Sequence, residues 1–149
     1  MEEGVTFHEL IENEFELPGR DLFSYPVLSL AFVGDNVYDL VVRTVLLSEG
    51  KCKVNLIHKA KSNLVKAETQ AWIAEYLISQ ELLTDEEKDY YRRGKNAKTA
   101  NHAKNADIAD YHKATGLETV MGYLYVTNQE ERAVKLCKLG IEAFRSEVE

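Results

Sequence analysis

The sequence has few of the residues from which several common functional sites are built. Its two cysteines, Cys52 and Cys137, lie far apart and form no CxxC or Cys/His pattern, which argues against a zinc site and is typical of a reducing compartment. Neither a P-loop nor a GxGxxG motif is present. The four histidines lack the partner motifs of a Ser/His/Asp or Cys/His arrangement. The classes of enzyme that these motifs identify are therefore without support.

Long hydrophobic runs are also missing. The first ten residues, MEEGVTFHEL, are acidic and contain no apolar core, and the most apolar segment is interrupted by Gly34, Asp35 and Asn36. We therefore expect neither a signal peptide nor a membrane span, and we expect a cytoplasmic protein. A chain of 149 residues fits one domain that can bury a core without disulfides.

Signals for β-strands are absent as well. No segment alternates between apolar and polar residues for long enough to indicate a strand, and the two prolines, Pro18 and Pro26, both precede the most apolar segment. Apolar residues in steps of three and four instead predict a long helix over 56–78 and another over 134–148. The sequence therefore predicts an all-α fold.

Other segments complete this helical arrangement. Residues 26–48 are apolar nearly all round, which is typical of a central helix, and residues 117–124 form an apolar stretch against which it can pack. A capping pattern predicts a short helix over 84–91. Residues 1–24 are expected to form an acidic appendage with one short helix at 7–13.

Basic residues are concentrated in two segments of an otherwise acidic chain. The formal net charge is −7, yet residues 51–66 and 90–105 each contain five basic residues and no acidic one. Solvated surface charge alone would explain either segment, but two together are typical of a surface that binds phosphate groups. The stretch 93–106 is expected to be an exposed loop. The candidate phosphate-binding residues are Lys59, Lys66, Arg92, Arg93, Lys95, Lys98 and Lys104.

Asp35 stands in an apolar segment, LSLAFVGDNVYDLVV at 28–42, where an unpaired carboxylate is energetically costly. One explanation is that Asp35 caps a helix that restarts immediately after it, and the other is that it binds a metal ion. Asp39 follows four residues later, with Arg43 a further four residues on, so an ion pair is its expected role. Asp39 is at most a supporting residue behind a metal ligand.

Glu118 allows the same two explanations. With Thr115 it forms a capping-box pattern, but it also lies on a helix stripe that contains no lysine or arginine to neutralise it. Two carboxylates on two apolar helices, with basic segments elsewhere and no candidate nucleophile, suggest a Mg²⁺ site, because Mg²⁺ prefers oxygen ligands and keeps several waters. Such a site favours phosphate chemistry.

Five stretches of the chain, in order, resemble a known family. LAFVGDNVYDLVVR and YHKATGLETVMGYLY resemble the two halves of the ribonuclease III catalytic signature, and specifically that of its short bacterial relatives, the Mini-ribonuclease III family. HKAKSNLVKAETQA at 58–71, YYRRGKNAKT at 90–99 and NADIADYHKATGLE at 105–118 also resemble that family. The resemblance as a whole extends over most of the chain.

The resemblance implies a dimeric, all-helical endoribonuclease that cleaves double-stranded RNA with Mg²⁺ and leaves 5′-phosphate ends. Asp35 and Glu118 match the family's catalytic, metal-binding pair, and the basic segments would supply the contacts to RNA. Residues 25–149 would form the catalytic domain, without a separate double-stranded-RNA-binding domain. The implied substrate is precursor ribosomal RNA of the large subunit, presented with the help of a ribosomal protein.

The residues alone also allow a function without catalysis. A helical adaptor that binds RNA or associates with the ribosome would carry the same basic segments, and Asp35 and Glu118 would then serve only as helix caps. The two functions differ in one respect, since the adaptor binds RNA without cleaving it in the presence of a metal ion.

Overall fold

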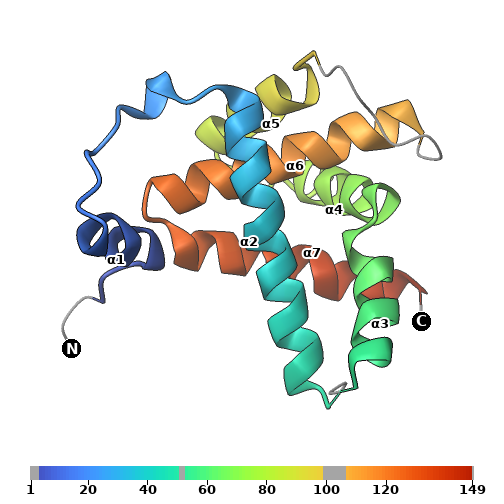
Figure 1. Ribbon diagram of the computed structural model, residues 1–149. Coiled ribbons are helices and arrows are strands. Elements are labelled where there is room, and N and C mark those ends of the chain that lie inside the picture. Colours follow the sequence, from blue (N-terminus) through green and yellow to red (C-terminus); the bar gives the residue numbers. More distant parts are fainter. Residues whose placement is uncertain (1–3, 51–52, 99–106, 149) are drawn as a thin grey trace.

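The computed structural model describes residues 4–50, 53–98 and 107–148, and within these ranges the chain forms helices and no strand. The predicted all-α fold is therefore confirmed. None of the described helices is long and apolar enough to cross a membrane. The helices, shown in Figure 1, are α1 (Phe7–Glu14), the 3₁₀ turn η1 (Leu22–Ser24), α2 (Val27–Ser48), α3 (Val54–Val65), α4 (Ala67–Ser79), α5 (Asp85–Lys95), α6 (Ile108–Val126) and α7 (Glu130–Val148).

The most enclosed helix is α6. It packs against α2, α4 and α5, and α7 lies beside it (Figure 1). The apolar stretch predicted over 117–124 lies in the middle of α6, where Leu117, Val120 and Leu124 are almost completely buried. Helix α6 is therefore the centre of the core, and the other helices are arranged around it.

Only one face of α2 is buried within the chain. Leu30, Tyr38 and Val42 face the core, whereas Phe32 is 74% exposed and Leu40 is 59% exposed. The expectation that residues 26–48 form a central, enclosed helix is therefore wrong for the single chain. The reason is that α2 lies across one side of α6, and among the described residues its opposite face is not covered by another helix.

The long helix predicted over 56–78 is wrong, because the chain breaks at Lys66 into α3 and α4. Lys66 has extended backbone angles of φ −65° and ψ 153°. The hydroxyl of Thr69 donates to the carbonyl oxygen of Asn63 at 2.5 Å, and the Gln70 amide nitrogen donates to that of Val65 at 2.8 Å. These bonds satisfy carbonyl groups at the end of α3, so the break costs little in lost hydrogen bonds.

The predicted capping of α5 is confirmed. Thr84 accepts from the backbone of Glu87, and the Glu87 side chain bonds back to the backbone of Thr84. The helix runs further than predicted, to Lys95, so the expected loop over 93–106 does not begin at residue 93, and its residues 99–106 lie outside the described residues. Basic residues near its end are favoured because the last turn of a helix carries partial negative charge.

The N-terminal segment contains the helix predicted there. Helix α1 begins after Thr6, whose side chain and Glu9 form a capping box. The Thr6 hydroxyl and the His8 ring both contact the Asn128 side-chain oxygen at 2.9 Å, at the turn between α6 and α7. Polar contacts therefore hold α1 against the helical body.

Candidate active site

The backbones of α2 and α6 touch where the two helices cross. A β-carbon on Gly34 would overlap the carbonyl oxygen of Glu118, and a β-carbon on Gly122 would overlap the carbonyl oxygen of Leu30. Since any other residue at 34 or 122 would push the helices apart, glycine is required at both positions. The crossing brings the segment around Asp35 directly against the segment around Glu118.

Asp35 and Glu118 meet at this crossing, where their side chains share a hydrogen bond. Helix α2 is continuous from Val27 to Ser48, so Asp35 does not cap a restarted helix. Glu118 lies in the middle of α6, and the Thr115 hydroxyl donates to the carbonyl of Tyr111 instead of capping. Both capping explanations are therefore wrong, and the two carboxyl groups face each other from different helices.

The two carboxyl groups differ in environment. Asp35 is exposed to solvent, whereas Glu118 is partly buried. The pKa of Glu118 is raised to about 8, first by burial and then by the hydrogen bond to Asp35 and the negative charge of Asp35, while a hydrogen bond from Gln70 acts in the opposite direction. Two carboxyl groups this close cannot both ionise easily, so they attract a proton or a cation.

The donor set at the crossing fits Mg²⁺. The described residues contain no group of three or more His, Cys, Asp or Glu side chains that could hold a metal ion, and at the crossing they offer a pair of carboxyl groups. Mg²⁺ is commonly held by one or two carboxylates while waters and phosphate oxygens complete its shell. The Gln70 side chain, which hydrogen-bonds Glu118, also carries a buried oxygen, Oε1, that has no hydrogen-bond partner among the described residues.

Sequence reasoning missed Gln70. Its side chain is 3% exposed and lies in the first turn of α4, where its amide contacts the Glu118 carboxylate. The residue falls inside HKAKSNLVKAETQA, a stretch that already resembles the family, and that was the available signal. The periodic pattern concealed it, because a long unbroken helix gives no reason for a buried glutamine at this position.

Asp39 forms the ion pair that its spacing predicts. Arg43 Nε lies 2.7 Å from one carboxylate oxygen of Asp39, and Lys61 Nζ on α3 lies 3.5 Å from the other. Asp39 therefore links α2 to α3. It lies one turn after Asp35, and a supporting role at the metal site stays a prediction.

The candidate basic residues lie in two separate parts of the fold. Lys59 is exposed on α3 and Lys66 is exposed at the joint between α3 and α4. The second group lies around the end of α5, at the top of Figure 1 and apart from α3. Its described members are Arg92, Arg93, Lys95 and Lys98, and Lys104 lies outside the described residues.

The two arginines of the second group are partly neutralised. Arg92 pairs with Asp89 at 2.5 Å, and Arg93 lies 4.0 Å from the same carboxylate. The Arg93 guanidinium also stacks over the ring of Tyr90 at 4.9 Å. Asp89 therefore weakens the positive potential at the end of α5.

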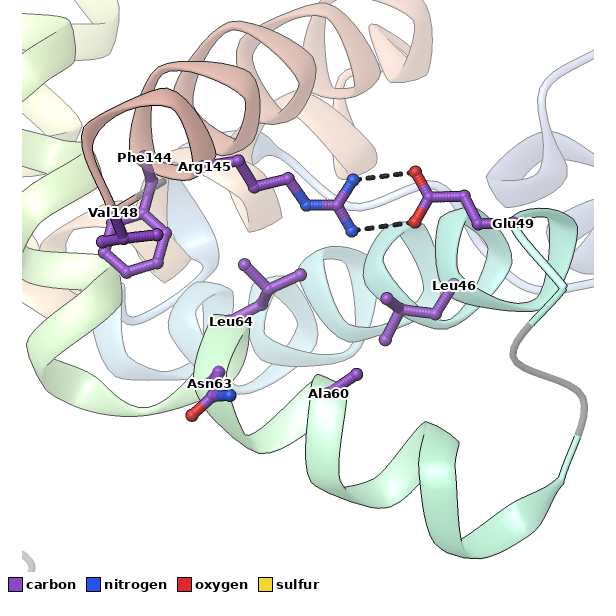
Figure 2. Close-up of a pocket in the computed structure, with 8 residues that line it drawn as sticks. All are labelled: Leu46, Glu49, Ala60, Asn63, Leu64, Phe144, Arg145 and Val148. Atoms are coloured by element: carbon purple, nitrogen blue, oxygen red, sulfur yellow. Dashed lines mark hydrogen bonds and ion pairs between the residues drawn. The ribbon is translucent and has the colours of Figure 1, made fainter.

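A pocket of about 440 Å³ lies away from the carboxylate pair, between the ends of α2 and α7 and the side of α3 (Figure 2). Arg145 bridges it with a bidentate pair to Glu49, at 2.8 and 2.9 Å. Neither Asp35 nor Glu118 lines this pocket. Its lining residues are Leu46, Glu49, Ala60, Asn63, Leu64, Phe144, Arg145 and Val148.

Comparison with known proteins identifies relatives along most of the chain. A model of the Ribonuclease III domain matches residues 28–129, a range that includes both carboxylates. Mini-ribonuclease 3 of Enterococcus faecalis is 43% identical over 117 residues, which cover 78% of this chain and 89% of that protein. Mini-ribonuclease 3 of Clostridium tetani is 41% identical over 131 residues, covering 87% of this chain and 85% of that protein.

A solved structure has the same fold. The crystal structure of protein FN1578 from Fusobacterium nucleatum superposes with a TM-score of 0.70 at 30% sequence identity. The match covers 80% of this chain and 93% of that one.

Proposed function

Because the chain belongs to the ribonuclease III family, we propose that Asp35 and Glu118 form the metal-binding centre at which it cleaves double-stranded RNA. Family membership makes the chain an endoribonuclease. One observation supports this assignment of the centre. Two carboxyl groups, one from α2 and one from α6, lie together where the helices cross closely at glycines.

In this proposal Asp35 and Glu118 hold Mg²⁺ together. When bound, Mg²⁺ activates water for attack on the scissile phosphorus and offsets negative charge on the leaving 3′ oxygen. Glu118 would hold the ion as an ionised carboxylate, since a metal ligand must be deprotonated. The rigid crossing holds both carboxylates in place during the reaction. Asp39 supports the site from one turn away, and the products carry 5′-phosphate and 3′-hydroxyl ends.

The two basic groups bind the RNA in this proposal. Lys59 and Lys66 contact one part of the duplex, and the basic end of α5, together with Lys104, contacts another. Duplex RNA is recognised mainly by its shape, its phosphates and its 2′-hydroxyls across the minor groove, which suits separate basic groups on a helical body. Residues 25–149 form the catalytic and binding domain, and residues 1–24 are an appendage.

A second copy of the chain covers the exposed face of α2. Phe32, which lies one turn before Asp35, and Leu40 after it expose most of their side chains. Large apolar side chains exposed beside a catalytic centre are typical of an interface. A symmetric dimer would bury these side chains on both copies. Two centres across the dimer would then each cut one strand.

The substrate we propose is precursor ribosomal RNA of the large subunit, which places the protein in the cytoplasm. The net charge of −7 opposes association with RNA, and only two small groups of cations counter it. A ribosomal protein that presents the RNA would compensate for this weak attraction.

The test is cleavage of a long duplex RNA with Mg²⁺ or with EDTA, using the wild type, Asp35→Asn and Glu118→Gln. We expect EDTA and either substitution to reduce cleavage by about 10²–10³-fold or more, because each removes metal-dependent stabilisation of several kcal/mol. Glu142→Gln, which changes an exposed carboxylate on α7, is the matched control and keeps full activity.

Circular dichroism shows whether each variant is folded. A folded Asp35→Asn variant that cuts as fast as the wild type would remove Asp35 from the centre. A wild type that binds the duplex but never cuts it, with any divalent ion, would contradict the proposed activity.

A further inference from the structure

Gln70 is a buried polar side chain beside the proposed centre. It lies in the first turn of α4 and is 3% exposed. Its amide nitrogen donates to the carbonyl oxygen of Val65 at 2.8 Å, and its side chain also hydrogen-bonds the Glu118 carboxyl group. An amide nitrogen carries two N–H groups, so it can serve both acceptors at once.

These two bonds connect Glu118 to a fixed part of the backbone. The Val65 carbonyl lies at the end of α3, and the joint between α3 and α4 holds the Gln70 side chain in place. Glutamate has three rotatable side-chain bonds, so its carboxylate can point in several directions unless a neighbour fixes it. Gln70 limits that freedom from the side of α4.

We propose that Gln70 is a positioning residue that holds the Glu118 carboxylate in the orientation in which it binds the metal ion with Asp35. This inference rests on the proposed roles of Asp35 and Glu118. Groups that hydrogen-bond a metal ligand orient it and tune its basicity, and their loss typically reduces metal affinity or activity by about 10–100-fold. The buried Gln70 Oε1, which has no partner among the described residues, can accept from a water molecule in the centre.

Gln70 also stabilises the joint between α3 and α4, so a purely structural role must be separated from positioning. Thr69 provides the comparison, because its hydroxyl spans the same joint by donating to the Asn63 carbonyl at 2.5 Å. Thr69 is equally buried, at 1% exposed, and no hydrogen bond joins it to Asp35 or Glu118 among the described residues. Thr69→Val therefore damages the joint without affecting the carboxylates.

The experiment compares Gln70→Met and Thr69→Val, which both remove a buried hydrogen bond at the joint while keeping side-chain volume. We expect both to lower the melting temperature by a similar amount and to leave duplex-RNA binding in EDTA unchanged. Only Gln70→Met should lower kcat, by about 10-fold or more, and raise the Mg²⁺ concentration needed for half-maximal cleavage several-fold. KM for the RNA should stay at its wild-type value.

A Gln70→Met variant with the kcat and Mg²⁺ dependence of the wild type would overturn the inference, and so would an equal loss of kcat in Thr69→Val. If Gln70→Met does not fold, Gln70→Asn replaces it, because the shorter amide keeps a polar group but cannot reach both acceptors. A wild-type kcat for Gln70→Asn would likewise overturn the inference.

Asp35→Asn and Glu118→Gln in the same assay separate this inference from the proposed centre. Full activity in those two variants would mean that the centre itself is wrongly assigned. Inactive Asp35→Asn and Glu118→Gln beside a fully active Gln70→Met would mean that only the positioning role is wrong.

Discussion

The backbone of Gly34 rests directly on the backbone of Glu118, so that a β-carbon at residue 34 would overlap the Glu118 carbonyl oxygen. Gly34 directly precedes Asp35, one proposed metal ligand, and it contacts Glu118, the other. The spacing of the two carboxylates is therefore set by backbone packing at the helix crossing. Side-chain rotation then adjusts only the final orientation of each group.

Gly34→Ala tests this dependence. The added methyl group forces α2 and α6 apart, so we expect a loss of about 3 kcal/mol or more in the free energy of unfolding. Cleavage per folded molecule should also fall, because the carboxylates separate. Urea denaturation and the duplex-cleavage assay measure the two effects.

Gly19→Ala is the control for Gly34→Ala, since a β-carbon at Gly19 would meet no atom within 4 Å. It should unfold at nearly the wild-type urea concentration. A Gly34→Ala variant with the same midpoint as Gly19→Ala would show that the crossing tolerates a side chain.

The raised pKa of Glu118 predicts a pH-dependent stability in the absence of metal. The pKa is about 8 in the folded chain, against 4.5 for an ordinary glutamate, because burial and Asp35 disfavour the ionised form. The stabilising contribution of the protonated group is complete below pH 4.5 and is lost as the pH rises through 8. Glu118→Gln, which stays neutral, should gain stability relative to the wild type by roughly 2–4 kcal/mol between pH 5 and pH 8.

Urea unfolding in EDTA at several pH values measures this difference. Glu142→Gln serves as the control and should show no such trend, since the Glu142 side chain is exposed on α7. A stability difference between wild type and Glu118→Gln that stays constant from pH 5 to pH 8 would contradict the prediction. Saturating Mg²⁺ should stabilise the wild type and not Glu118→Gln.

The sequence identified the two carboxylates but not how they are supported. Asp35 was singled out by its apolar segment, Glu118 by a helix stripe without lysine or arginine, and both by the two motifs that resemble the family; the structure brings them together. The apolar periodicity also located α6 and α7. These features were predictable because each depends on residues close together in the chain.

The features that sequence analysis missed depend on contacts between distant segments. The break at Lys66 preserves the periodic pattern on both sides, so periodicity could not reveal it. The role of Gln70 depends on its contact with Glu118, which lies on another helix and is distant in the sequence. Phe32 is a large apolar residue, which sequence analysis assigns to the core, and only the packing of α2 shows that it is exposed.

Phe32→Asp tests the proposed dimer. A charge on this side chain, which is 74% exposed in the single chain, should leave the fold stable but prevent a second copy from packing against α2. Sedimentation should show a dimer for the wild type and a monomer for the variant at micromolar concentration. Phe23→Asp is the control, because Phe23 is 82% exposed but lies outside α2, so this variant should remain a dimer. A monomeric wild type, or a dimeric Phe32→Asp, would contradict the proposal.

The proposed RNA contacts predict how binding depends on salt. Each cation that contacts a phosphate releases bound counterions, so the slope of log affinity against log salt should become shallower by about one for each contact removed. In EDTA, where no cleavage occurs, Lys59→Ala with Lys66→Ala should therefore make the slope shallower by about two. Lys135→Ala, an exposed lysine on α7, should leave the slope unchanged. An unchanged slope in the double variant would remove these lysines from the interface.

Asp89 allows the second basic group to be tested by removing a negative charge, which should strengthen RNA binding. Its carboxylate neutralises Arg92 and Arg93 in the free protein, so it competes with RNA phosphates for the same cations. Asp89→Asn should therefore bind duplex RNA several-fold more tightly at low salt, and the gain should shrink as salt screens the charges. Binding that weakens in Asp89→Asn would instead mean that Asp89 holds the arginines in the geometry that RNA requires. Unchanged binding would place the end of α5 outside the interface.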